Sequence, residues 1–183
     1  MAVDVVPYRA EWPRLFARLA SDLRRALRGV GSASVEHAGS TSVPGLAAKP
    51  ILDVDVVVDA EDTTAAVAAL ESIGYVHRGD LGVAGREAFR APDEDPRRNV
   101  YVCTAGTLNV RNHLAVREVL RRRDDLREEY AAVKMALAAD PGMDIDTYIA
   151  RKSAVLQKVL AESDLLTDDE RQQIRLLNDP TWP

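Results

Sequence analysis

Residues 51–58 read Ile-Leu-Asp-Val-Asp-Val-Val-Val, an apolar run interrupted twice by aspartate. Its length and its β-branched residues predict a strand that is buried on both faces. Because successive side chains of a strand point to opposite faces, Asp53 and Asp55 share one face. Two carboxylates on such a strand lose favourable solvation unless a positive charge compensates.

The Asp53 and Asp55 pair is typical of a divalent-metal site. Mg²⁺ is commonly held by one or two carboxylates together with waters and substrate phosphates, and Mn²⁺ accepts the same oxygen ligands. The pair therefore predicts a site for Mg²⁺ or Mn²⁺. The alternative is that both residues lie at an exposed strand end or form ion pairs with arginines.

Upstream, residues 39–45 read Gly-Ser-Thr-Ser-Val-Pro-Gly, which is too rich in turn residues for regular structure. We expect a loop that follows a short strand over residues 34–38. Gly39 allows the backbone to approach a ligand closely, and its neighbours supply hydroxyls and exposed N–H groups. The candidate phosphate-binding residues here are Gly39, Ser40, Thr41, Ser42 and Lys49. Alone the loop could be a simple turn, but the Asp-x-Asp pair fourteen residues on favours a phosphate site.

The first part of the chain mixes helices and strands. Apolar residues at three- and four-residue spacing predict a helix that begins at Pro13 and ends near Gly29 or Gly31. Asp62 is expected to cap a helix over residues 63–72. Further strands are expected over residues 75–78, 86–90 and 99–104.

The second part is helical. A helical pattern begins after Thr107 and continues until Asp140-Pro141-Gly142 interrupts it. Another helix is expected over residues 145–161. Thr167 and Glu170 form a capping-box pattern for a last helix that ends near residues 178–180.

A chain of 183 residues with 46% hydrophobic content can bury one sizeable core, so we expect a single domain. Strands followed by helices predict an α+β fold, with a mixed sheet and its helices ahead of a C-terminal helical half. We place the α/β core at about residues 1–105 and the helical part at about 106–161. We expect residues 162–183 to be an added helix and tail.

Composition limits the functional classes. The formal net charge of -5 argues against non-specific coating of nucleic acid. Cys103 is the only cysteine, which excludes an intramolecular disulfide and favours a reducing compartment. No signal-peptide pattern occurs in residues 1–12, and no apolar run reaches about 18 residues. We expect a cytoplasmic protein that acts on a small molecule, without nucleic-acid or membrane partners; the oligomeric state stays open.

Residues 37–56, His-Ala-Gly-Ser-Thr-Ser-Val-Pro-Gly-Leu-Ala-Ala-Lys-Pro-Ile-Leu-Asp-Val-Asp-Val, resemble the signature of the GrpB/UPF0157 family, a branch of the nucleotidyltransferase superfamily. Residues 113–121, His-Leu-Ala-Val-Arg-Glu-Val-Leu-Arg, are similar to a helix of that family. Its pattern is also matched at Pro7-Tyr8, Trp12, Tyr130, Lys134, Tyr148 and Lys152. The resemblance spans about residues 5–160.

This resemblance implies a nucleotidyltransferase fold that binds a nucleoside triphosphate such as ATP. By the family pattern, Gly39 and Ser40 contact phosphates, while Asp53 and Asp55 hold the metal. Arg117, Lys134 and Lys152 would converge on the same cleft as anion contacts. Surface salt bridging is the alternative for these three residues.

The chain departs from efficient nucleotidyltransferases at a later strand, where a third carboxylate is usual. Residues 99–102 read Asn-Val-Tyr-Val, so Asn99 and Tyr101 share a strand face and are candidate ligand contacts. Arg86 and Arg90 are further candidate phosphate contacts. Glu87 could substitute for the carboxylate, although alternation sets it opposite both arginines, and a solvated glutamate is the alternative.

His37 is a candidate catalytic base, and its alternative is a hydrogen-bonded structural histidine beside the loop. The leading hypothesis is metal-dependent nucleotidyl transfer to, or activation of, a small molecule. One alternative is a nucleotide-binding or folding-assistance module without turnover. Another is a nucleotide-dependent bond-forming enzyme of a biosynthetic pathway.

Overall fold

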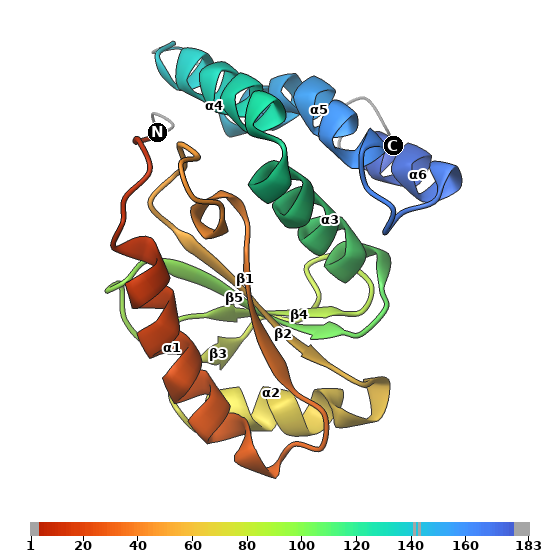
Figure 1. The fold of residues 1–183 in the computed structure, drawn as a ribbon. Coiled ribbons are helices and arrows are strands. Elements are labelled where there is room, and N and C mark those ends of the chain that lie inside the picture. The colour runs from red at the N-terminus through yellow and green to blue at the C-terminus, as the bar shows by residue number, and fades with distance from the viewer. Residues whose placement is uncertain (1–3, 141, 143, 178–183) are drawn as a thin grey trace. The chain divides into compact units, whose positions relative to one another are not determined.

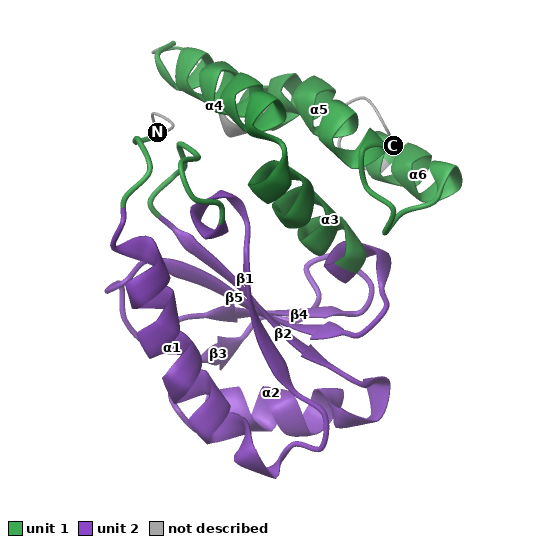
Figure 2. Ribbon diagram, in the orientation of Figure 1, with its two compact units in different colours: residues 1–9, 43–50, 111–183 green, residues 10–42, 51–110 purple. Residues whose placement is uncertain are grey.

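The computed structural model describes residues 4–140, 142 and 144–177. Their chain divides into two compact units (Figure 2): a sheet unit of residues 10–42 and 51–110, and a helical unit of residues 1–9, 43–50 and 111–183. The predicted α+β fold, with strands first and helices last, is confirmed. Among the described residues, no helix has both the length and the apolar character needed to span a membrane. The expected single domain, with boundaries near residues 105 and 161, stays a prediction.

The sheet unit contains a mixed five-stranded sheet with the order β1-β2-β5-β4-β3 (Figure 1). The central pair, β2 and β5, is parallel, and every other neighbouring pair is antiparallel. The strands are β1 (Ser34–Ala38), β2 (Leu52–Val58), β3 (Val76–His77), β4 (Arg86–Arg90) and β5 (Arg98–Thr104). All five were expected from the sequence, with bounds within two residues.

Register divides the residues of this sheet between two faces. On the face that we call the apolar face, alternate residues of β2 and β5 are buried: Leu52, Val54, Val56, Val58, Val100 and Val102. The other, which we call the carboxylate face, carries Asp53 and Asp55 of β2 beside Asn99 and Tyr101 of β5. Burial of Val54 and Asp55 alike confirms that β2 is covered on both faces.

Two helices accompany the sheet: α1 (Trp12–Ala26) and α2 (Thr63–Glu71). Both pack against its strands and against each other, as Figure 1 shows. Phe16 of α1 stacks on the His37 ring with 4.4 Å between centroids, and His37 lies on the apolar face. The two helices therefore complete the hydrophobic core of this unit.

The expected side-chain cap by Asp62 is wrong. A 3-10 helix, η3 (Ala60–Asp62), precedes α2 directly, so Asp62 is itself helical and makes no side-chain cap bond. Its carboxylate instead accepts hydrogen bonds from the Ser32 backbone N–H at 2.8 Å and the Ser32 hydroxyl at 2.9 Å. These bonds lower the pKa of Asp62. They join the segment before β1 to the segment after β2.

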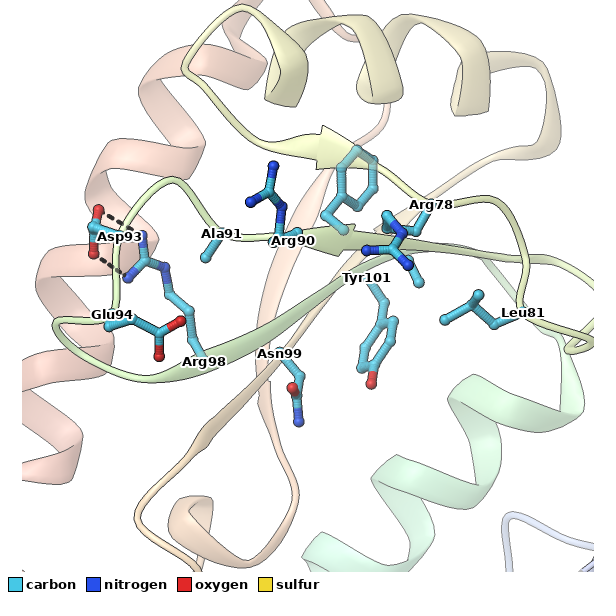
Figure 3. A pocket seen from close by; sticks show the side chains of 11 residues that line it. Arg78, Leu81, Arg90, Ala91, Asp93, Glu94, Arg98, Asn99 and Tyr101 are labelled. Atoms are coloured by element: carbon cyan, nitrogen blue, oxygen red, sulfur yellow. Dashed lines mark hydrogen bonds and ion pairs between the residues drawn. The ribbon is translucent and has the colours of Figure 1, made fainter.

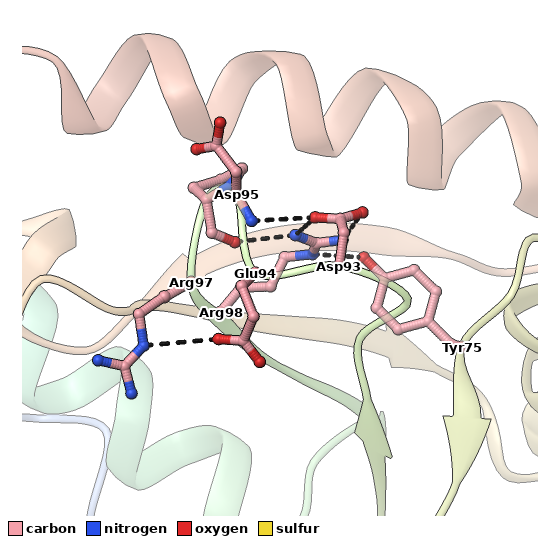
Figure 4. A network of polar contacts seen from close by, with 7 residues as sticks. Tyr75, Asp93, Glu94, Asp95, Arg97 and Arg98 are labelled. Atoms are coloured by element: carbon pink, nitrogen blue, oxygen red, sulfur yellow. Dashed lines mark hydrogen bonds and ion pairs between the residues drawn. The ribbon is translucent and has the colours of Figure 1, made fainter.

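A network around Arg98 organises the loop between β4 and β5 (Figure 4). The Arg98 guanidinium donates to both carboxylate oxygens of Asp93, at 2.7 and 3.0 Å, and to the Tyr75 hydroxyl at 2.9 Å. It also donates to the Pro96 carbonyl at 2.8 Å. Because only 5% of the Arg98 side chain is exposed, these partners compensate a largely buried charge.

In its described residues the helical unit contains four helices: α3 (Leu108–Arg122), whose first turn belongs to the sheet unit, α4 (Asp124–Ala138), α5 (Ile145–Ala161) and α6 (Asp168–Leu177). Its core is made of apolar residues of α3, α4, α5 and the segment 43–50: Val43, Leu46, Val119, Leu120, Leu126, Tyr130, Val155 and Val159. Segment 43–50 is held to the N-terminal segment by two backbone hydrogen bonds between Val6 and Ala48, at 2.9 and 3.0 Å.

The helical run expected from residue 107 to the Asp140-Pro141-Gly142 break is two helices, because Arg123 is extended and separates α3 from α4. Arg121 and Arg122 end α3, and Asp124 and Asp125 begin α4. Basic residues stabilise a helix C-terminus and acidic residues an N-terminus, so the charge order favours a break at this point. Apolar spacing alone did not indicate it.

The capping box at the start of α6 is confirmed. The Thr167 N–H donates to the Glu170 carboxylate at 2.9 Å, and the Glu170 N–H donates to the Thr167 hydroxyl at 3.3 Å. These bonds satisfy two backbone donors at the start of the helix. The predicted end of this helix at residues 178–180, and Pro141 of the predicted break, lie outside the described residues.

Candidate functional site

The carboxylate face brings together four of the residues predicted from the sequence. Asp53 is paired in register with Asn99, and Asp55 with Tyr101. The Asn99 side-chain amide donates to Asp53 Oδ1 at 2.8 Å, which orients that carboxylate. Asp55 is only 1% exposed, so the structure excludes an exposed strand end for this residue.

Gly39 lies directly against Asp53. Its φ of +65° belongs to the left-handed region, and a Cβ at this position would stand 2.1 Å from Asp53 Oδ2. Only glycine therefore fits both the backbone conformation and the space. This contact joins the Gly-Ser loop to the Asp-x-Asp strand, fourteen residues apart in the sequence.

The three hydroxyl residues of the loop differ in their surroundings. The Thr41 hydroxyl lies 3.0 Å from His37 Nε2, and the Ser42 hydroxyl donates to the Gly39 carbonyl at 2.6 Å. Both residues are buried, so these bonds brace the loop. Ser40 is half-buried, and its hydroxyl forms no hydrogen bond with any described residue.

His37 is placed on the apolar face, since its register partner is Val54. Its ring stacks on Phe16 and its Nε2 is within hydrogen-bonding distance of Thr41. These surroundings match the structural histidine that was the alternative. Register sets the ring on the opposite side of the sheet from both aspartates.

Arg86 and Arg90 lie on the carboxylate face, because Arg86 is paired with Cys103 and alternation along β4 sets Arg90 on the same side. The Arg86 guanidinium is 4.7 Å from the centroid of the Tyr101 ring, a cation–π distance. Burial raises the pKa of the Tyr101 hydroxyl, and the charge of Asp53 raises it further. The hydroxyl is therefore un-ionised at neutral pH.

Glu87 belongs to the apolar face, where its carboxylate lies 2.6 Å from His77 Nε2. It therefore does not supply a third carboxylate beside Asp53 and Asp55. Sequence reasoning missed another acid, Glu36, which is paired with Asp55 and shares its face. Alternation along the expected strand 34–38, next to the strand of the aspartates, was the signal for it.

The residues described here contain no group of three or more histidine, cysteine or acidic side chains arranged to hold a metal ion. The acidic side chains of the carboxylate face are Asp53 and Asp55 of β2, with Glu36 of β1 paired to Asp55. Such a donor set suits Mg²⁺ or Mn²⁺ when substrate phosphates and water complete the coordination.

The helical unit groups two of the predicted lysines around one tyrosine. Lys49 Nζ is 4.8 Å and Lys152 Nζ is 5.5 Å from the centroid of the Tyr148 ring. Tyr148 is buried, and burial raises its pKa to about 12. Two cations on one aromatic side chain form a local positive cluster.

Lys134 and Arg117 have other surroundings within the helical unit. Lys134 is 3% exposed, and its ammonium donates to the Ala47 carbonyl and lies 4.8 Å from the centroid of the Tyr130 ring. Arg117 donates to Glu118 at 2.8 Å. That Arg117, Lys134 and Lys152 share one cleft with the two aspartates stays a prediction, because these residues belong to different units.

A pocket of about 350 Å³ opens in the sheet unit (Figure 3). It is lined by residues of β4, β5 and the loops beside them: Arg78, Leu81, Ala88, Phe89, Arg90, Ala91, Asp93, Glu94, Arg98, Asn99 and Tyr101. Asn99 and Tyr101 extend from the same side of β5 (Figure 3). The pocket therefore adjoins the carboxylate face, and it adds Arg78, which sequence reasoning did not single out.

The profile of the GrpB protein family matches residues 2–162, which include the whole sheet unit and most of the helical unit. The chain belongs to the GrpB family. Among relatives of this GrpB-family chain, a UPF0157 protein of Halalkalibacterium halodurans is 37% identical over 161 residues, which cover 87% of this chain and 81% of the relative. A UPF0157 protein of Streptomyces coelicolor is 38% identical over 85% of this chain and 81% of its own length.

Solved structures agree with this membership. The crystal structure of GrpB from Enterococcus faecalis has a TM-score of 0.74 and 30% identity, covering 93% of this chain and 99% of that one. A chain from the structure of the GLD-2/RNP-8 complex has a TM-score of 0.53 and 12% identity, covering 96% of this chain and 69% of that one. This second likeness concerns the fold alone. The GrpB-family chain thus has a nucleotidyltransferase-like fold, as the sequence resemblance implied.

Proposed function

We propose that this protein binds a nucleoside triphosphate, such as ATP, together with Mg²⁺ or Mn²⁺, and transfers a nucleotidyl group to a small molecule. The observation that carries the proposal is the contact between Gly39 and Asp53, where a Cβ would stand 2.1 Å from the carboxylate. It joins a loop suited to phosphates and a carboxylate pair suited to a cation into one site. Membership of the GrpB family and the nucleotidyltransferase-like fold support the same assignment.

Each residue of this site has a distinct role in the proposal. Asp53 and Asp55 hold the cation, and Asn99 orients Asp53 through its 2.8 Å hydrogen bond. Gly39 and Ser40 present backbone N–H groups to phosphate oxygens, while buried Thr41 and Ser42 keep the loop in shape. When bound, the cation would neutralise charge on the phosphates. Fixed positions of these side chains would supply the rest of the catalysis through orientation.

For the helical unit taken by itself, we propose that the positive cluster of Lys49 and Lys152 on Tyr148 is suited to bind phosphate. Ammonium groups bind phosphate oxygens as point charges and are suited to a flexible polyanion. We also propose a cytoplasmic protein whose substrates are small molecules rather than nucleic acids, in line with its net charge of -5.

A specific observation favours a second candidate, a nucleotide-binding or folding-assistance module without turnover. The residues beside Asp53 and Asp55 on β5 are Asn99 and Tyr101, so β5 supplies no carboxylate next to the pair. Release of pyrophosphate from ATP with pooled amino acids, amines and hydroxy acids distinguishes the two candidates. Acceptor-dependent release supports the enzyme, including one that forms bonds in a biosynthetic pathway, and binding without release supports the module.

The decisive variant is Asp53→Asn with Asp55→Asn, which keeps side-chain shape and removes the charge that attracts metal. Saturation of the wild type to about a hundred times the dissociation constant of Mg²⁺ and ATP should add about 2.7 kcal/mol to the free energy of unfolding. The double variant should gain almost nothing from the same ligands. Its stability without ligand should equal or exceed that of the wild type, because repulsion between neighbouring carboxylates is removed.

Glu61→Gln with Glu71→Gln is the matched control, since it removes two exposed acids of the same unit. The control should keep the full response to Mg²⁺ and ATP, and EDTA should abolish that response in the wild type. A double aspartate variant that retains the ligand-dependent gain would place nucleotide binding elsewhere. Severe destabilisation without ligand would show that the aspartates serve the fold.

A further inference from the structure

The pocket beside the carboxylate face contains two arginines without an acidic partner. Arg78 and Arg90 line it, both are exposed, and neither forms an ion pair with any residue in the described part of the chain. We propose that this pocket is the acceptor site, and that it takes a small molecule carrying a carboxylate or phosphate group besides its nucleophilic hydroxyl or amine. This inference rests on the proposed nucleotidyl transfer and names the class of its second substrate. It assigns Arg90, which the sequence suggested as a phosphate contact, to that second substrate rather than to the nucleotide.

Charge within the pocket supports an anionic ligand. Three arginines and two acids line it, but Arg98 holds Asp93 through two hydrogen bonds and Glu94 lies 3.7 Å from Arg97. Arg78 and Arg90 are left as the uncompensated charges. A guanidinium donates in a planar fork that fits a carboxylate or a phosphate, so two of them favour such a group over a neutral one.

Strand order places Arg78 and Arg90 near the carboxylate pair. Asp53 on β2 is paired with Asn99 on β5, and β4 with Arg90 is the next strand. Arg78 lies at the same edge, since its N–H donates to the Ala88 carbonyl at 2.8 Å. Neighbouring strands are about 4.8 Å apart, so two strand spacings, about 10 Å, separate the backbone of Asp53 from that of Arg90. A small metabolite bound by Arg90 can reach toward the aspartates.

Size and shape agree with a small ligand. A pocket of about 350 Å³ is near the lower end of the range for small-molecule sites. Leu81, 62% exposed and at φ 49°, gives its rim an apolar side chain. Asn99 and Tyr101 line the side toward Asp53, where they would contact the nucleophilic end of the acceptor.

The transfer itself balances as follows. The acceptor oxygen or nitrogen forms a bond to the α-phosphorus of the triphosphate, and the bond from that phosphorus to the oxygen bridging to the β-phosphorus breaks. Pyrophosphate leaves with the electron pair, and the proton of the acceptor goes to solvent. The anionic group bound by Arg78 and Arg90 takes no part in bond formation and serves to orient the nucleophile.

Binding of two probes tests the proposal: succinate for a carboxylate and glycerol 3-phosphate for a phosphate ester. Each is titrated at low salt in EDTA without nucleotide, and binding is followed by NMR of the arginine side chains. Arg78→Gln with Arg90→Gln should weaken at least one probe about ten-fold or more. Arg25→Gln with Arg28→Gln, which changes two exposed arginines of the same unit that do not line the pocket, is the control and should bind like the wild type.

A second arm separates this proposal from the proposed function. Thermal stabilisation by Mg²⁺ and ATP should survive in the Arg78 and Arg90 variant and vanish in the Asp53 and Asp55 variant. The Asp53 and Asp55 variant should still bind the probes with the affinity of the wild type. Probe affinity should also persist in wild type saturated with Mg²⁺ and ATP. Probes that bind the arginine variant unchanged, or that compete with the nucleotide, would overturn the acceptor site. If the aspartate variant keeps its response to nucleotide, the proposed function fails, whatever the probes do.

Discussion

The two faces of the five-stranded sheet are formed by alternate residues of the same strands, yet the charged residues on the two faces have different neighbours. On the apolar face, polar groups occur with a local partner: Glu87 with His77, His37 with Thr41, and Arg98 with Asp93. On the carboxylate face, Asp53 and Asp55 are neighbours of equal charge, and Arg78 and Arg90 lack acidic partners among the described residues.

This contrast separates structural from functional polar residues. A partner within reach compensates the desolvation of a buried charge, so the paired groups of the apolar face can serve the fold alone. On the carboxylate face, Asp53 and Asp55 set two like charges side by side, which repel each other. A bound cation would relieve that repulsion. The carboxylate face is therefore the part of the sheet where substitutions should change ligand binding more than stability.

The largest expected effect comes from placing a charge on the apolar face. Val54→Asp buries an unpaired carboxylate at a position that is completely inaccessible, and should lower the free energy of unfolding by about 4 kcal/mol. Asp55→Val makes the reverse change at the next residue, on the carboxylate face. Its free energy of unfolding should equal or exceed that of the wild type. Urea denaturation of the two variants measures both. Equal losses of unfolding free energy in the two variants would contradict the proposed difference between the two faces.

An intermediate effect is expected for Gly39→Ala. The left-handed backbone should cost about 1–2 kcal/mol for alanine, and the collision with Asp53 should add to that loss. Gly106→Ala is the matched control, because Gly106 has a φ of +74° and no described atom lies within 4 Å of the place that its Cβ would take. Thermal denaturation with and without Mg²⁺ and ATP should show a larger loss for Gly39→Ala and loss of its ligand response. Identical behaviour of the two variants would remove the contact with Asp53 from the site.

The smallest effect concerns pH and the paired Arg98. The hydrogen bonds from Arg98 lower the pKa of Asp93 below its ordinary value of 3.8. A carboxyl whose pKa is lowered by folding stabilises the protein above the unfolded pKa, and this contribution is lost as the pH falls through the lowered folded value. The stability difference between wild type and Asp93→Asn should therefore be constant near neutrality and shrink below about pH 4. A difference that grows on acidification would contradict the assigned direction.

Several elements followed from local pattern alone. The alternation of residues 51–58 indicated the buried strand and the shared face of Asp53 and Asp55, and Thr167 with Glu170 indicated the start of α6. Both signals depend on neighbours within a few residues, where chain geometry fixes which side chains meet. The Gly-Ser loop was also identifiable, because its composition excludes regular structure.

The sequence by itself thus determined the strands, most helices and the two halves of the candidate site. Tertiary structure decided which groups meet: Asp62 with Ser32, Glu87 with His77, Gly39 with Asp53, and the pocket that contains Arg78 and Arg90. These relations depend on strand order and register, which are set by pairing between segments distant in the chain. A shift of one residue in register would exchange the two faces of a strand, so no local pattern could assign these partners.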